Sequence, residues 1–83
     1  MFKHASLYQL AVRIVNKNNK EAMDELLRRC KNDFDIVEHF LEYHIEQSDK
    51  LAEFIDETNR NEYRKQETIC KAFSKAAAQL IEE

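Results

Sequence analysis

Hydrophobic residues recur at intervals of three and four positions in four segments of the chain, which is the repeat of an amphipathic helix. The first two segments have short apolar faces, made of Leu7, Leu10, Ala11, Ile14 and Val15 and then of Met23, Leu26, Leu27 and Cys30. The third segment has the longest face, made of Phe34, Val37, Phe40, Leu41, His44, Ile45, Leu51, Phe54 and Ile55. The fourth carries Tyr63, Ile69, Cys70, Phe73, Ala76, Ala77, Leu80 and Ile81. We therefore expect three or four helices, with the longest ones in the second half of the chain.

Residues that favour the start of a helix precede each segment. Three pairs have the spacing of a capping box, namely Ser6 with Gln9, Asn18 with Glu21 and Asn59 with Glu62. Asp33 is suited to cap the third helix. We expect a helical hairpin over about 34–56 and 60–82, with a turn near 58–61. The alternative is one continuous helix of about 50 residues, which would need a second copy of the chain to bury its apolar seam.

The 83 residues include neither glycine nor proline. Tight β-hairpin turns depend on glycine and asparagine, whereas helices joined by asparagine-rich connections need neither missing residue. The phosphate-binding loops of P-loop and Rossmann type require glycines, so both are excluded. The expected fold is therefore all-α. It is a single helical domain over residues 1–83, a small three- to four-helix bundle in which the first two helices pack across the third and fourth.

Seven carboxylates follow one side of the third segment, three or four positions apart. They are Asp35, Glu38, Glu42, Glu46, Asp49, Glu53 and Asp56, and on a helix they form one acidic stripe. Like charges in neighbouring turns destabilise a helix by about 0.2–0.5 kcal/mol per pair, so the stripe as a whole costs about 1–3 kcal/mol. Because this is a large cost for a small domain, we take the stripe as the candidate partner-binding site.

The net charge of −3 is distributed unevenly along the chain. Residues 1–32 carry a net charge of +4, residues 33–57 carry −8 and residues 58–83 carry +1. Two interpretations of the stripe remain open. Either it is a solvated face that Arg13, Arg28 and Arg29 on the neighbouring helices partly neutralise, or it binds a basic surface on a protein, such as the nucleic-acid groove of a nucleic-acid-binding protein.

No group of residues indicates catalysis or metal binding. His39 and His44 are five positions apart, which turns them about 140° from each other around a helix, so they do not form an i,i+4 ligand pair. Cys30 and Cys70 lie on apolar faces, where free cysteine behaves as a small hydrophobic residue. We therefore expect no enzyme activity, no metal and no cofactor.

Compartment and membrane association follow from composition. No segment approaches the roughly 20 consecutive apolar residues of a membrane span, and we find no pattern of a signal peptide. Two cysteines suit a reduced, cytoplasmic protein better than a disulfide scaffold.

The main functional hypothesis is a small non-enzymatic protein-binding regulator, inhibitor or adaptor, of the kind that phages and plasmids use to modulate host machinery. It would engage the basic surface of a protein partner through its acidic helix. One alternative is a helical oligomerisation or structural subunit that forms a homodimer. A further alternative is a transcription regulator that binds nucleic acid directly, which repulsion between phosphates and the acidic helix disfavours.

Overall fold

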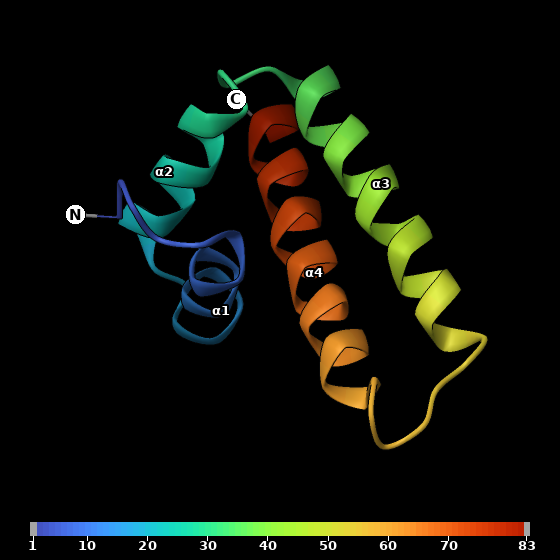
Figure 1. Ribbon diagram of the computed structural model, residues 1–83. Coiled ribbons are helices and arrows are strands. Elements are labelled where there is room, and N and C mark those ends of the chain that lie inside the picture. The colour runs from blue at the N-terminus through green and yellow to red at the C-terminus, as the bar shows by residue number, and fades with distance from the viewer. Residues whose placement is uncertain (1, 83) are drawn as a thin grey trace.

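The computed structural model describes residues 2–82, which form four α-helices. These are α1 (Leu7–Lys17), α2 (Lys20–Arg29), α3 (Phe34–Ala52) and α4 (Arg60–Glu82). α4 runs through the middle of the molecule, with α1 and α2 on one side and α3 on the other (Figure 1). The expected all-α bundle is confirmed, with no strand among the described residues. None of the described helices has the length and apolar content needed to cross a membrane.

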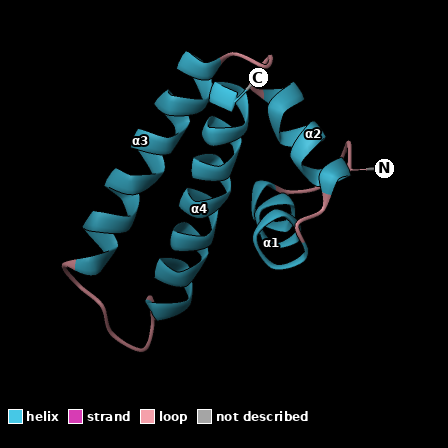
Figure 2. Cartoon of the chain, turned by 180° about the vertical axis from the view of Figure 1, so that it is seen from behind, coloured by secondary structure: helices cyan, strands magenta, loops and turns pink. Residues whose placement is uncertain are grey.

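The packing of the first two helices differs from the expectation. α1 packs on α4 and on α2, and α2 makes a smaller contact with α4. α3 packs almost entirely on α4, and the view from behind shows α4 standing between α3 and the two short helices (Figure 2). The short helices therefore bury their apolar faces on α4 instead of crossing both long helices, and α3 is left as an outer helix.

Two of the helix starts form as the sequence predicts. Before α1, Ser6 and Gln9 make a reciprocal capping box: the Gln9 N–H donates to Ser6 Oγ (3.1 Å) and the Ser6 N–H donates to Gln9 Oε1 (2.8 Å). Before α3, a carboxylate oxygen of Asp33 accepts a hydrogen bond from the Asp35 N–H (2.8 Å). These bonds satisfy backbone donors that have no partner within the first turn of a helix.

The connection between α1 and α2 corrects the second predicted capping box. Asn18 does not start α2 but ends α1, in the left-handed conformation (φ 52°) that asparagine tolerates and that glycine usually supplies. Asn19 takes the capping position instead, and its side-chain oxygen accepts a hydrogen bond from the Ala22 N–H (3.0 Å). The box predicted for Asn18 was therefore one residue out of place.

α3 ends at Ala52, about four residues before the predicted end, and residues 53–59 form the turn that the sequence placed near 58–61. Asp56 Oδ1 accepts hydrogen bonds from the N–H groups of Thr58 (2.8 Å) and Asn59 (3.1 Å). The side-chain oxygen of Asn59 in turn accepts from the Asp56 N–H (2.9 Å). Because Asn59 is used within the loop, the capping box predicted with Glu62 does not form. These local bonds compete with the helix and stop it.

The buried core lies mainly between α1, α2 and α4. Its members are Leu10, Ala11, Ile14, Ala22, Met23, Leu26, Leu27, Cys30, Val37, Ile69, Ala72, Phe73 and Ala76, and only Val37 comes from α3. The apolar face predicted for α3 is therefore too wide. Phe40 (40% exposed) and Ile45 (44%) flank the contact with α4, while Phe54 (72%) and Ile55 lie beyond the end of the helix. A single neighbouring helix covers only a narrow part of the circumference of α3.

Aromatic stacking fixes α3 on α4. Phe73 of α4 is 2% exposed and stacks with two residues one turn apart on α3. Its ring centroid is 5.8 Å from that of Phe40 and 5.6 Å from that of His44, with interplanar angles of 15° and 13°. His44 Nδ1 is also within hydrogen-bond distance of Gln66 Oε1 (2.9 Å). The predicted core position of His44 is confirmed, with its polar atom satisfied by α4.

Candidate functional site

The acidic stripe lies along α3 for five of its seven predicted members. Asp35, Glu38, Glu42, Glu46 and Asp49 are all exposed to solvent. They lie on a different part of the α3 circumference from its buried residues Val37, His44 and Ser48, and Asp49 at the edge of the stripe also borders α4. The stripe is therefore a surface feature of an outer helix. The Cβ atoms of neighbouring carboxylates are about 5–6 Å apart, as is typical of i,i+3 and i,i+4 neighbours on a helix.

The structure does not bring the last two predicted members onto the helix. Glu53 is the residue that follows the last turn of α3, and Asp56 lies in the loop. The Asp56 carboxylate accepts two backbone hydrogen bonds there, so its local role is to shape the turn. Both side chains remain exposed, and they continue the negative charge beyond the helix without its regular spacing.

The arginines expected to neutralise part of the stripe are engaged elsewhere, so that part of the first interpretation is wrong. Arg28 and Arg29 both pair with Glu25 of α2, at 2.7 Å each. The guanidinium carbon of Arg13 lies 6.0 Å from the centroid of the Phe2 ring, in a cation–π position. The three arginines belong to α1 and α2, the two helices that α4 separates from α3 (Figure 1).

Among the described residues, one cation pairs with the stripe. Lys50 Nζ lies 3.5 Å from Glu46 Oε1, and both side chains are about two-thirds exposed. An ion pair with this exposure contributes little, because water and salt screen it and two flexible side chains must be ordered. The stripe therefore keeps most of its negative charge.

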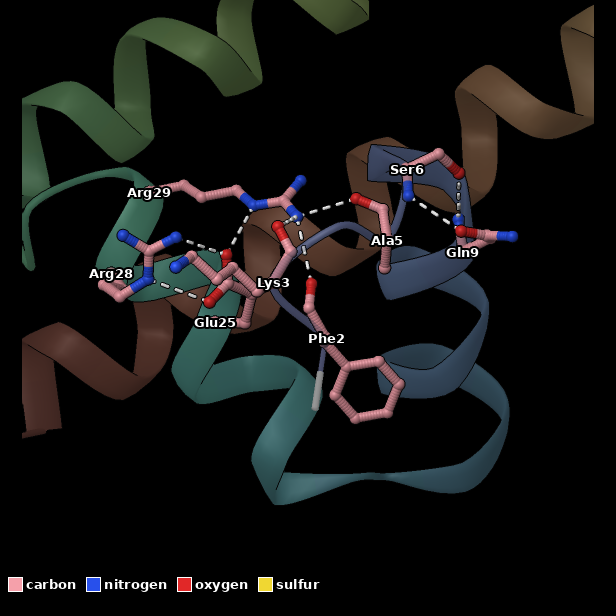
Figure 3. A network of polar contacts seen from close by, with 8 residues as sticks. All are labelled: Phe2, Lys3, Ala5, Ser6, Gln9, Glu25, Arg28 and Arg29. Atoms are coloured by element: carbon pink, nitrogen blue, oxygen red, sulfur yellow. Dashed lines mark hydrogen bonds and ion pairs between the residues drawn. The ribbon is translucent and has the colours of Figure 1, made fainter.

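The arginine pair has a structural role of its own, shown in Figure 3. The Nη2 group of Arg29 donates hydrogen bonds to the backbone oxygens of Phe2 (3.2 Å), Lys3 (3.3 Å) and Ala5 (2.7 Å). Its Nε donates to Glu25 (2.7 Å), which Arg28 contacts through two nitrogens. The bonds from Arg28 and Arg29 lower the pKa of Glu25 to about 2. These contacts hold the N-terminal segment against α2.

The histidines and cysteines are divided between the surface and the core. His39 is exposed, whereas His44 is buried against Phe73. Cys30 is buried in the core and Cys70 is half-buried on α4, and burial raises the pKa of both thiols. No group of three potential metal ligands occurs within residues 2–82.

Two features near the stripe were not expected from the sequence. Ser48 is only 9% exposed, and it lines a hollow between α3 and α4 together with Ile45 and Cys70. The sequence does hold a signal for Ser48, since it follows His44 by four residues on the buried side of the helix. A polar side chain at such a position resembles a surface residue until its neighbours are known.

No family model, curated protein or solved structure matches this chain.

Proposed function

We propose that this protein is a small non-enzymatic binding module, a regulator, inhibitor or adaptor, that engages the basic surface of a protein partner through the acidic stripe on α3. One observation carries the proposal: five carboxylates at helical spacing stand exposed on an outer helix, while Arg28 and Arg29 are paired with Glu25 on α2. A fixed array of like charges favours association with a surface of opposite charge and raises the rate of encounter.

The stripe is also costly, which supports a role outside the folded chain. The four neighbouring pairs from Asp35 to Asp49 destabilise the helix by about 1–2 kcal/mol. Uncompensated repulsion of this kind is relieved when a basic partner binds. Partners with a row of lysines or arginines fit this chemistry, including proteins that use such a row to bind nucleic acid.

The proposal is tested by reversing charge at the centre of the stripe. The variant Glu42→Lys with Glu46→Lys is compared with a matched control, Asp24→Lys with Glu82→Lys, which makes the same charge change at exposed positions outside the stripe. Each protein is immobilised, and the proteins retained from the native host are identified by mass spectrometry. We expect a basic protein to be retained by the wild type and the control and lost from the stripe variant. Equal retention by all three, with unchanged salt dependence, would show that the stripe is not the interface.

A second candidate function is self-association, which the exposed apolar residues favour. Phe40, Tyr43 and Ile45 on α3 and Phe54 in the loop are each at least 40% exposed. Pairing of two α3 helices would have to turn both acidic stripes away from the interface, because facing stripes repel each other. Light scattering behind a sizing column separates the candidates, since a mass of 9.9 kDa that does not change with concentration would exclude the homodimer.

A further inference from the structure

A hollow of about 240 Å³ lies between α3 and α4 beside the acidic stripe. Six residues line it, three from each helix: Ile45, Ser48 and Asp49 from α3, and Glu67, Cys70 and Lys71 from α4. Asp49 belongs to both the stripe and the hollow, so the two surfaces are continuous. Sites for drug-sized ligands start at about 300 Å³, and this smaller hollow suits a single side chain.

Ser48 presents a polar group to the hollow. The residue is 9% exposed, and its hydroxyl makes no hydrogen bond with the other described residues. A helical serine or threonine often bonds to the carbonyl four residues earlier, as Thr68 does with Arg64 O (3.0 Å). Ser48 does not use this option. No buried side-chain oxygen or nitrogen of the described residues lacks a partner, so the Ser48 oxygen is reachable from the hollow and can accept a hydrogen bond from a donor that enters it.

Each wall of the hollow carries one carboxylate. Asp49 stands on α3 and Glu67 on α4. Burial is the main reason why the pKa of the Cys70 thiol is raised, and the charges of Asp49 and Glu67 raise it further. Both carboxylates therefore lie close enough to the Cys70 thiol to influence its pKa. Lys71 is the one cation in the lining, and it forms no ion pair with another described residue.

The combination of an apolar wall, a hydroxyl acceptor and two carboxylates identifies the side chain that fits. We propose that the hollow receives an arginine side chain of the basic protein partner. Its aliphatic stem lies on Ile45, and its guanidinium donates hydrogen bonds to Asp49, Glu67 and the Ser48 hydroxyl oxygen. Arginine offers five N–H groups in a planar fork, which reaches acceptors on two helices, whereas the compact ammonium of lysine does not. The inference rests on the proposed function, since it names the residue by which the basic partner is anchored.

Synthetic peptides test the choice of side chain. Three blocked nine-residue peptides have two lysines on each side of a central position that is arginine, lysine or citrulline, the last being the neutral isostere of arginine. Each is titrated into the full-length, isotopically labelled protein, and amide shifts are followed by NMR. We expect the arginine peptide to shift Ile45, Ser48 and Cys70. It should bind about threefold or more tightly than the lysine peptide and about tenfold more tightly than the citrulline peptide.

Variants outside the stripe locate the site. Ser48→Ala and Glu67→Gln should each weaken binding of the arginine peptide by about three- to tenfold. Lys71→Ala removes a competing cation and should strengthen it by about two- to fivefold. Glu62→Gln is the matched control on α4, about 140° around the helix from Glu67, and should bind as the wild type does. A purely structural role for Ser48 would lower the melting temperature of Ser48→Ala, whereas a binding role leaves it unchanged or higher, since alanine favours helix.

The possible results separate this inference from the proposed function. Weaker binding after Glu42→Gln with Glu46→Gln, but wild-type binding by Ser48→Ala and Glu67→Gln, would support the stripe and overturn the arginine site. Equal affinity for the arginine and lysine peptides would overturn the choice of arginine. Binding that none of these substitutions changes, or no shift at Ile45 and Ser48, would count against both proposals.

Discussion

Replacement of Phe73 by leucine should loosen the attachment of α3 to the bundle. Phe73 stacks with Phe40 and His44 at centroid distances of 5.8 and 5.6 Å, and each stacked aromatic pair contributes about 0.5–1.5 kcal/mol beyond its buried area. Leucine keeps the site apolar but removes both stacks, so we expect a loss of about 1–3 kcal/mol. The total stability of an 83-residue domain is about 4–12 kcal/mol, so the effect is large.

Urea unfolding followed by circular dichroism measures this loss. With a slope of about 1 kcal/mol per molar urea, the midpoint should fall by about 1–3 M. Phe54→Leu is the control, because Phe54 is 72% exposed and its replacement should change stability by no more than about 0.5 kcal/mol. Equal losses in the two variants would refute the conclusion that Phe73 fixes α3 on α4. Hydrogen exchange adds a second readout, since amides of α3 should exchange faster in the Phe73 variant than those of α1.

Three further predictions concern local features of the chain. Lys31→Gly should raise stability by about 0.5–1 kcal/mol, because Lys31 has a left-handed backbone (φ 56°) that glycine adopts without strain. Lys75→Gly, within α4, should instead cost about 1 kcal/mol in the same urea assay. The pKa of Glu25 is lowered from 4.5 to about 2, so its stabilising effect is complete above pH 4.5 and is lost as the pH falls toward 2. Glu25→Gln should flatten the pH dependence of the melting temperature in that range, and an unchanged profile would contradict the assignment. Glu38→Gln with Glu42→Gln removes three like-charge neighbours and should add about 0.6–1.5 kcal/mol. A gain that persists in about 1 M salt would not be electrostatic.

The helices of this fold could be predicted from local patterns, because their starts depend on residues close in sequence. Ser6 with Gln9 and Asp33 show this, since each cap is complete within three residues. Prediction failed where two local patterns competed. Asn18 and Asn19 are both suited to helix ends, and the order in which they are used depends on where α1 stops. The loop residues Asp56 and Asn59 bond to each other, which no single-residue preference reveals.

Burial on α3 could not be predicted in the same way, because it depends on how many neighbours the helix has. Periodicity places Phe40 and Ile45 on an apolar face, but α4 alone covers that face and leaves both partly exposed. The acidic stripe was predicted through Asp49, since its spacing is local. The hollow beside it was not, because Glu67 and Ser48 meet there from different helices.

The central place of α4 has a consequence for synthesis on the ribosome. α1 is made first, yet the surface that buries Leu10, Ala11 and Ile14 includes residues 60–82, the last of the four helices to leave the exit tunnel. Until then α1 and α2 can bury their apolar faces only against each other. The aromatic residues of α3 that stack on Phe73 have no partner. Folding is therefore expected to wait until α4 has been made, and a chain stopped after residue 59 should remain unfolded and accessible to chaperones and proteases.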